Sequence, residues 1–236
     1  MTADPILQLD HIHTFIGQFH ILEGVSVEVP ANSITVLLGR NGAGKTTTLR
    51  SIIGLNPPSD GSIRYLGQEI GGKRPFDIAQ AGIGYVPDYR AIFKQLTVEE
   101  NLKVAERSKG DLDRKKDFIF EVFPDLHKLY HWPGGQLSGG QQQMLAVARV
   151  LVPDNRLLLI DEPSEGLAPV IIEQMIAAIR QLSSQTTVLL VEQNFHVARL
   201  LAENYVIIED GRSVHNGRME ALVKDEQLIN RYLGAA

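Results

Sequence analysis

The chain has 236 residues, 44% of them hydrophobic, which is enough for one large domain or for a core with an inserted lobe. Its formal net charge of −5 gives no indication of a nucleic-acid partner, and we expect none. The absence of cysteine excludes disulfides, thiolate catalysis and cysteine-ligated metal sites, and it suits a reducing compartment.

The sequence shows no sign of a targeting or membrane-spanning segment. Its first ten residues lack the basic start and the long apolar run of a secretory signal. No uninterrupted apolar stretch reaches the roughly 18 residues that a spanning helix needs. We therefore expect a cytosolic chain that reaches a membrane only through another protein.

The first part of the chain is rich in predicted strands. Their residues alternate between apolar and polar, or form β-branched runs that end at glycine. A segment with helical spacing begins at Lys45 and ends at Gly54, before Pro57 and Pro58. The predicted strands of this part are residues 6–13, 25–30, 33–39 and 62–67.

From Pro87 to about Val152 the chain becomes helical and more charged. Thr97 and Glu100 have the spacing of a capping box, which predicts the start of a helix. Further along, apolar residues recur at helical spacing, which predicts amphipathic helices. The helices predicted here lie within residues 96–106, 113–123 and 141–152.

The last part of the chain returns to alternating strands and helices. Residues 156–163 and 186–193 contain apolar strands of the kind found inside a parallel sheet. A helix over residues 169–182 lies between them, which completes a βαβ unit. Residues 205–217 predict a terminal hairpin, and a closing helix follows.

This order of elements predicts an α/β fold in one nucleotide-binding domain. We expect a catalytic core, residues 1–87 and 153–236, whose N-terminal part is an antiparallel β subdomain. A helical subdomain, residues 88–152, is expected to interrupt that core.

The run GRNGAGKT, residues 39–46, fits the P-loop pattern G-x-x-x-x-G-K-[ST] between a predicted strand and a predicted helix. Backbone N–H groups of such a loop face phosphates, and the helix N-terminus favours the same anion. Lys45 is expected to reach the β- and γ-phosphates of ATP, and the Thr46 hydroxyl to bind Mg²⁺. The alternative is a glycine-rich turn with a chance lysine. The predicted nucleotide-binding residues of this segment are Gly39, Arg40, Asn41, Gly42, Ala43, Gly44, Lys45, Thr46 and Thr47.

Two acidic residues end the apolar run LLLIDEP. Asp161 and Glu162 stand where a strand ends, and open α/β sheets bind their ligands at that edge. We expect Asp161 to hold the Mg²⁺ and Glu162, nearer the γ-phosphate, to polarise the attacking water as the catalytic base. Lys45 is expected to be catalytic as well. Adjacent carboxylates on a surface turn are otherwise merely solvated.

The run LSGGQ, residues 137–141, has a structural and a functional interpretation. Alone, Ser138 and Gln141 form a capping box, and Gly139 and Gly140 shape the turn. Together with the P-loop and the LLLIDEP strand, the run resembles the signature motif of the ATP-binding subunits of ABC transporters, and the three motifs stand in that family's order. The resemblance implies a head-to-tail pair of subunits in which Ser138, Gly139, Gly140 and Gln141 contact the ATP held by the partner.

Four positions depart from the common pattern of that family. Asp88 replaces a glutamine that is a ligand near the metal, and because a carboxylate keeps the acceptor capacity we expect Asp88 to be a metal ligand. Gln193 replaces the switch histidine as a catalytic residue, so a hydrogen bond to the γ-phosphate is retained without the positive charge. Ala168 replaces an aspartate. The aromatic residue that stacks on adenine is expected just before Gly17, where Ile16 stands beside Phe15. Phe15 stacks on adenine or packs in the core.

The departures narrow the resemblance. Asp88 after YVP, the run DEPSEGLAP and the run VEQN together resemble the ATP-binding subunits of branched-chain amino-acid importers, and urea-importer subunits look similar. The resemblance implies a second ATP-binding subunit, either a non-identical relative or another copy, together with integral membrane permeases. A solute-binding protein would act indirectly, and the chain would lie at the cytoplasmic face of the membrane. Residues 88–101 would form the groove for a short permease helix.

Other interpretations stay open. One is a nucleotide-gated binding subunit with little hydrolysis, suggested by Gln193 and Asp88, and another is an ABC-type ATPase that acts outside transport. His11 and His13 alternate on one strand and could face a metal, although no third ligand is evident. The transported solute is not encoded in this chain, because other subunits select it.

Overall fold

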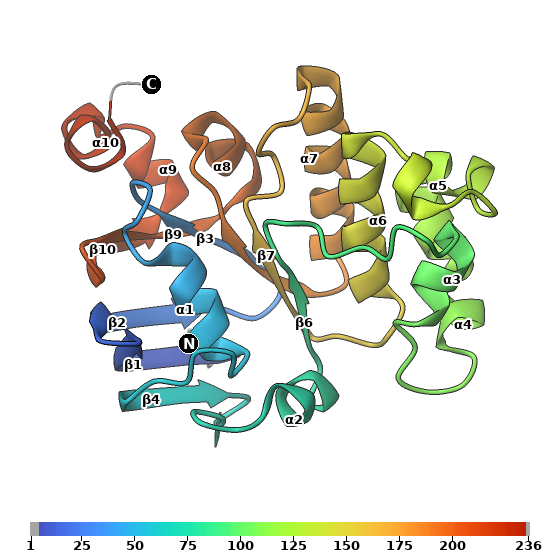
Figure 1. The fold of residues 1–236 in the computed structure, drawn as a ribbon. Coiled ribbons are helices and arrows are strands. Elements are labelled where there is room, and N and C mark those ends of the chain that lie inside the picture. The colour runs from blue at the N-terminus through green and yellow to red at the C-terminus, as the bar shows by residue number, and fades with distance from the viewer. Residues whose placement is uncertain (1–4, 235–236) are drawn as a thin grey trace.

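Two sheets and the helices around them form the protein (Figure 1). The computed structural model describes residues 5–234. In that part of the chain the smaller sheet is antiparallel, with strand order β2-β1-β4-β5. Its strands are β1 (Leu7–Ile16), β2 (Phe19–Val29), β4 (Asp60–Tyr65) and β5 (Gln68–Glu69).

The larger sheet carries the predicted P-loop and the acidic strand. Its order is β10-β9-β3-β8-β7-β6, and all neighbouring strands are parallel except the β9–β10 hairpin. Because β6, β7, β8 and β3 are parallel neighbours, the loops at their carboxyl ends share one edge of the sheet. The strands are β3 (Ile34–Leu38), β6 (Ile83–Val86), β7 (Leu157–Asp161), β8 (Thr187–Val191), β9 (Asn204–Glu209) and β10 (Arg212–Arg218).

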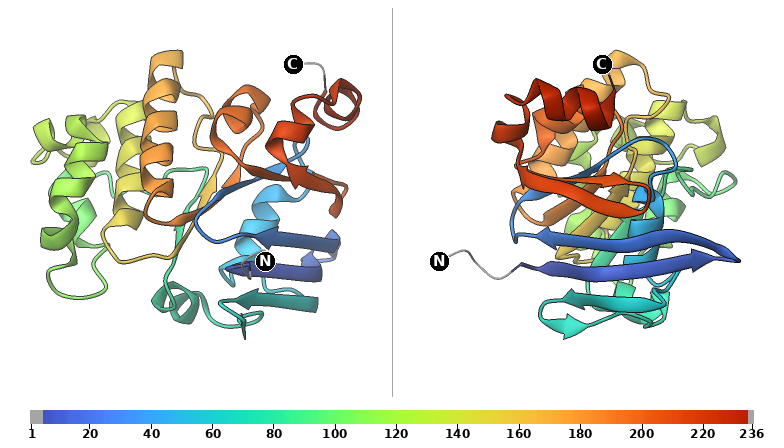
Figure 2. Two further views of the ribbon diagram at one scale, coloured as in Figure 1. Left: turned by 180° about the vertical axis from the view of Figure 1, so that it is seen from behind. Right: turned by 90° about the vertical axis from the view of Figure 1, so that its left-hand side faces the viewer.

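The helices fall into two groups (Figures 1 and 2). One group lies between β6 and β7 in the sequence and gathers at the end of the molecule away from β1, β2 and β4. It comprises α3 (Val98–Lys103), α4 (Asp111–Val122), α5 (Pro124–Lys128), a 3-10 turn (Gly134–Gln136) and α6 (Gly139–Leu151). The other helices are α1 (Lys45–Ile52), α2 (Pro75–Gln80), α7 (Pro169–Ser183), α8 (Phe195–Leu201), α9 (Met219–Leu222) and α10 (Glu226–Leu233).

The larger sheet is buried on both faces, as the apolar run of β7 shows. Leu157 and Leu159 belong to one hydrophobic cluster, which they share with Leu49 and Ile52 of α1 and with the smaller sheet. Leu158 and Ile160, which point to the opposite face, belong to a second cluster with α6, α7 and α8. Each such side chain stabilises the fold by roughly 1.5–3 kcal/mol. The strand therefore holds its carboxyl end, and the acidic residues there, in a fixed place.

Most predicted elements are present, and the differences have physical causes. The capping box of α3 forms as predicted, with Glu100 N–H donating to Thr97 Oγ1 and Thr97 N–H to Glu100 Oε2. The strand predicted at 25–30 is too short, because β2 begins at Phe19 and pairs with β1 across several register shifts. Helix α2 was not predicted, since it is short and only Ile78 of it is buried.

No helix in the part of the chain that the structure describes is long and apolar enough to cross a membrane.

Candidate nucleotide-binding and hydrolysis site

The P-loop connects β3 to α1 and keeps its shape through close backbone contacts. Gly39 has φ 146°, and a Cβ there would lie 2.1 Å from the Ile208 carbonyl oxygen. Gly44, at the start of α1, has φ 109°, and a Cβ there would lie 2.7 Å from Leu22 Cδ2. These two positions therefore accept only glycine, which explains their places in the motif.

Lys45 lies in the curl of this loop and is only 4% exposed. Its Nζ donates to the carbonyl oxygens of Gly39 at 2.9 Å and Arg40 at 3.1 Å, and it stands 3.7 Å from Glu162 Oε1. Burial lowers the pKa of Lys45, and the carboxylates of Glu162 and Asp161 oppose that shift. The ammonium group thus bridges the loop and the acidic end of β7, where a triphosphate would meet both.

Asp161 is fully buried at the end of β7. Its Oδ1 accepts a hydrogen bond from Thr46 Oγ1 at 3.1 Å, and its Oδ2 accepts one from the Tyr85 hydroxyl at 3.3 Å. Burial raises the pKa of Asp161 to about 6, and the charge of Asp88 adds to that rise. A carboxylate beside a hydroxyl at a phosphate site is the oxygen donor set that suits Mg²⁺.

Asp88 follows β6 at the same edge, but its contacts are not with the other two predicted metal ligands. Its Oδ1 lies 4.0 Å from Arg50 Nη2 of α1 and accepts from the Tyr89 N–H at 3.0 Å. Among residues 5–234 no three histidine, aspartate or glutamate side chains converge as a metal site. Asp88 is nevertheless close enough for its charge to act on Asp161, and the three expected metal ligands, Thr46, Asp161 and Asp88, stay a prediction.

Glu162 has a strained backbone, with φ 45° in the left-handed region. Its N–H donates to the Val191 carbonyl oxygen of β8 at 2.9 Å. Burial raises the pKa of its carboxyl group, and Lys45 opposes that shift. Strain of this kind persists where surrounding contacts enforce it, and it is typical of reactive positions.

Lys45, Thr46 and Glu162 line one cavity of about 480 Å³, whereas Asp161 and Asp88 do not line it. Its lining joins the P-loop, α1, the loop after β7 and the tip of the β1–β2 hairpin. Of the two hairpin residues considered for adenine, Ile16 lines the cavity and Phe15 does not, since its ring stacks on His20 at 4.2 Å between centroids. The lining residues are Ile16, Ile21, Asn41, Gly42, Gly44, Lys45, Thr46, Thr47, Glu162 and Glu165.

Two lining residues, Ile21 and Glu165, were not predicted from the sequence. Ile21 follows the register shifts of the β1–β2 pair, which no local pattern reveals. Glu165 stands three residues after Glu162 in the run SEGLA, and that proximity was the available signal.

The remaining P-loop residues serve the loop itself. Ala43 is 6% exposed, and its carbonyl oxygen accepts from Gly211 N–H at 2.9 Å. Arg40 contributes the backbone oxygen that Lys45 binds. Gln193 stands in the exposed turn after β8, and it does not line the cavity.

The signature residues begin α6 and form the capping box that the sequence allowed. Gln141 N–H donates to Ser138 Oγ at 3.3 Å, and Ser138 N–H to Gln141 Oε1 at 2.9 Å. A Cβ on Gly140 would lie 2.7 Å from Ile171 Cγ2 of α7, whereas one on Gly139 would meet only the Arg90 guanidinium, at 3.3 Å. Packing within the chain therefore explains Gly140 and leaves Gly139 without a comparable structural cause. None of the four residues lines the cavity of their own chain.

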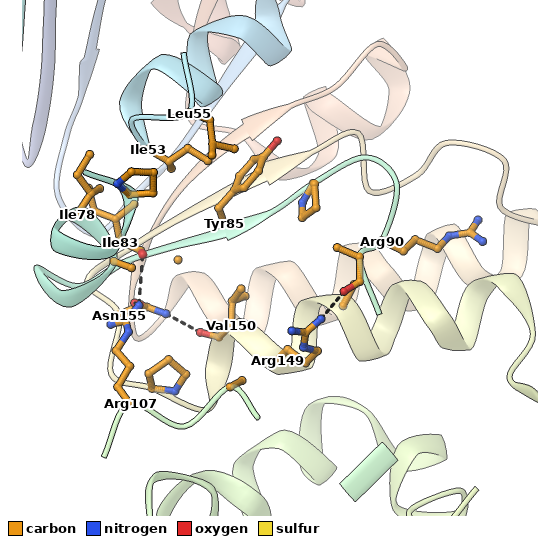
Figure 3. A pocket seen from close by; sticks show the side chains of 18 residues that line it. Ile53, Leu55, Ile78, Ile83, Tyr85, Arg90, Arg107, Arg149, Val150 and Asn155 are labelled. Atoms are coloured by element: carbon orange, nitrogen blue, oxygen red, sulfur yellow. Dashed lines mark hydrogen bonds between the residues drawn. The ribbon is translucent and has the colours of Figure 1, made fainter. Parts of the chain in front are cut away.

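A second cavity, of about 350 Å³, opens between the catalytic strands and the α3–α6 group (Figure 3). Tyr85 and three arginines, namely Arg90, Arg107 and Arg149, are among the residues that line it. Arg107 Nη2 donates to Asn155 Oδ1 at 2.8 Å, and Asn155 Nδ2 donates to the Val150 carbonyl oxygen at 2.7 Å. The segment predicted to form a groove contributes Arg90 and Ala91 to this lining.

Comparison with known proteins decides which family combines these features. The family model described as "ABC transporter" matches residues 22–165, which hold the P-loop, the signature motif and the acidic end of β7. The chain belongs to the ABC transporter family. Proteins of this family bind ATP and hydrolyse it, and this ABC protein is accordingly a nucleotide-binding ATPase.

Relatives span the whole ABC domain. The chain is 42% identical over 232 residues to the high-affinity branched-chain amino acid transport ATP-binding protein BraG of Pseudomonas aeruginosa, which covers 97% of this chain and 100% of that one. It is 36% identical over 221 residues to a probable branched-chain amino acid transport ATP-binding protein LivF of Archaeoglobus fulgidus, which covers 92% and 94%. The ADP conformation of the ATP-binding cassette MJ1267 shares the fold, with a TM-score of 0.85, 24% identity and coverage of 98% and 99%.

Proposed function

We propose that this ABC ATPase energises the import of branched-chain or related amino acids, as the names of its relatives suggest. The observation that carries the ATPase part is the meeting of α1 and β7, where Lys45 lies 3.7 Å from Glu162 and Thr46 donates to Asp161 at 3.1 Å. A urea-importer subunit would share the same site, so the names of the relatives, and not the site, support the solute.

In the proposed reaction Lys45 exchanges its carbonyl partners for the β- and γ-phosphates of ATP. Mg²⁺, when bound, neutralises charge on the phosphate oxygens, and Thr46 and Asp161 are the residues that would hold it. Glu162 orients the attacking water and accepts its proton, a role that its raised pKa favours because the carboxylate is then a stronger base. Gln193 would act through a hydrogen bond to the γ-phosphate.

The proposed ATP-bound state pairs two subunits, either this chain with a non-identical relative or two copies of it. Ser138, Gly139, Gly140 and Gln141 would then contact the ATP held by the partner subunit, at its γ-phosphate. The exposed start of α6 supports this role, because a helix N-terminus offers free N–H groups to an anion and Gly139 lets it approach closely. Loss of the γ-phosphate would then weaken the pair.

The proposed membrane partners are permease subunits at the cytoplasmic face, with a solute-binding protein acting through them. The proposed permease contact is the cavity of Figure 3. In this proposal the cavity separates a helical subdomain, residues 88–152, from the catalytic core. Its apolar floor and its arginines suit a short helix that carries an acidic residue.

The experiment compares Glu162→Gln with the unchanged chain. We expect ATP turnover to fall by at least about 100-fold while ATP binding persists, because only the base is removed. In cells that carry the variant, uptake of labelled leucine should stop. Undiminished turnover would overturn the assignment of Glu162, and normal leucine uptake with lost urea uptake would overturn the proposed solute.

A further inference from the structure

Glu192 is a buried acid that the proposed chemistry does not use. It follows β8 directly and is only 2% exposed. Glu192 forms no ion pair within residues 5–234, and burial raises the pKa of its carboxyl group even though the Lys45 ammonium interacts with it at longer range. A carboxyl group buried at such a cost is weak evidence for added stability, so its hydrogen-bond partners are the place to look for its role.

The two carboxylate oxygens of Glu192 bind two different loops. Oε2 accepts a hydrogen bond from the Ser164 hydroxyl at 2.8 Å, and Ser164 is itself 7% exposed. Oε1 accepts from the Asn194 N–H at 2.9 Å. Ser164 belongs to the loop that carries Glu162, and Asn194 belongs to the turn that carries Gln193 and caps α8.

The loop that Ser164 anchors is the one under strain. Glu162 has φ 45°, a conformation that non-glycine residues adopt at a cost of about 1–3 kcal/mol. Its N–H is fixed to the Val191 carbonyl oxygen, one residue before Glu192. The Glu162 loop is thus bound to the end of β8 at two points. One is the backbone N–H of Glu162, and the other is the hydroxyl of Ser164, two residues later.

We propose that Glu192 is a positioning residue, which holds the Glu162 loop and the Gln193 turn in one arrangement through the Ser164–Glu192 hydrogen bond. The inference rests on the proposed role of Glu162 as the catalytic base. It assigns to Ser164 a role in the rate of hydrolysis and none in ATP binding, because neither residue lines the nucleotide cavity.

The test measures kcat, KM and the Kd for ATP in Ser164→Ala, Ser164→Thr and Glu192→Gln. We expect kcat to fall about tenfold in Ser164→Ala, with the Kd within about twofold, since one hydrogen bond to a charged group is lost. Ser164→Thr keeps the hydroxyl and should recover most of the rate. Glu192→Gln keeps one acceptor oxygen for two donors and should also be slow. The double variant Ser164→Ala/Glu192→Gln should be no slower than the slower single variant.

Ser51→Ala is the matched control, because Ser51 is buried and its Oγ bonds Thr14 Oγ1 at 2.9 Å outside the two loops. It should lose a comparable amount of thermal stability and keep its kcat. The inference is overturned if Ser164→Ala stays within twofold of the unchanged kcat, or if Ser51→Ala slows turnover equally. A normal rate in Glu162→Gln would overturn the base and this inference together, whereas an inactive Glu162→Gln beside a normal Ser164→Ala would overturn this inference alone.

Discussion

At the scale of the residue, the signature motif shows how one run of sequence serves two purposes. Ser138 and Gln141 cap α6, and Gly140 makes room for Ile171 of α7, so three of the four residues have a cause within the chain. Gly139 does not, because an added Cβ would meet only the flexible guanidinium of Arg90. Folding and ATP-dependent pairing can therefore be separated by comparing two neighbouring glycines.

Gly140→Ala should lower the stability of the isolated chain by about 1–3 kcal/mol, because the added methyl group overlaps Ile171. Gly139→Ala should leave that stability within about 0.5 kcal/mol, and should nevertheless reduce ATP-dependent pairing. Denaturant unfolding gives the first quantity, and light scattering with ATP on a Glu162→Gln background gives the second. Equal stability losses in the two variants would contradict this division of roles.

The sequence also shows its limits at this scale. Lys45, Thr46, Asp161 and Glu162 were identified because their spacing follows from the chemistry of phosphate binding. The bond between Ser164 and Glu192 joins residues 28 positions apart, and no local pattern predicts it. The choice between Phe15 and Ile16 at the cavity has a similar origin, because a register shift lies between Thr14 and Phe15 in the β1–β2 pair and no local pattern predicts it.

At the scale of the element, α3 depends on its start more than on its length. It has only six residues, and isolated helices of that size are unstable in water. Its capping box and the burial of Val98 and Leu102 therefore fix where it forms. The sequence predicted this helix because a capping box is local, whereas α2 has no such local signal.

Thr97→Ala should lower the stability of the chain by about 1 kcal/mol, since the Glu100 N–H loses its acceptor. The hydrogen bonds from Thr97 lower the pKa of Glu100. The ionised Glu100 carboxylate therefore contributes stability above the ordinary pKa of a glutamate, and this contribution is lost as the pH falls through the lowered pKa. The stability difference between the unchanged chain and Glu100→Gln should therefore shrink on acidification. Urea titrations at several pH values measure it, and a difference that grows toward acid pH would contradict the sign.

At the scale of the whole molecule, the residues that we propose to form one site lie at two separate places in the chain. The P-loop cavity contains Lys45 and Glu162, whereas Ser138 and Gly139 begin a helix that does not line it. If these parts meet only between subunits, turnover must depend on how many subunits are paired. The order of motifs predicts the α/β class and the helical insertion, but not the strand order of the sheets or the lining of either cavity, because these depend on contacts between residues far apart in the sequence.

The specific ATPase activity of the purified chain should therefore rise with protein concentration and level off once pairs are saturated. Gly139→Ala, which should pair more weakly, should show a weaker rise at equal ATP occupancy. Removal of Mg²⁺ with EDTA should stop turnover in both, because Thr46 and Asp161 would no longer hold the ion beside the phosphates. A specific activity that is independent of concentration across the micromolar range would contradict pairing.

The parallel order of β6, β7, β8 and β3 has one more consequence. Four segments far apart in the chain follow these strands and lie at one edge of the sheet. They contain Asp88, Glu162, Glu192 and the P-loop. If a γ-phosphate bound at this edge is lost, the contacts of all these loops change together. Release of a phosphate at this edge would therefore be felt by several loops together, without a conformational change that passes along the chain.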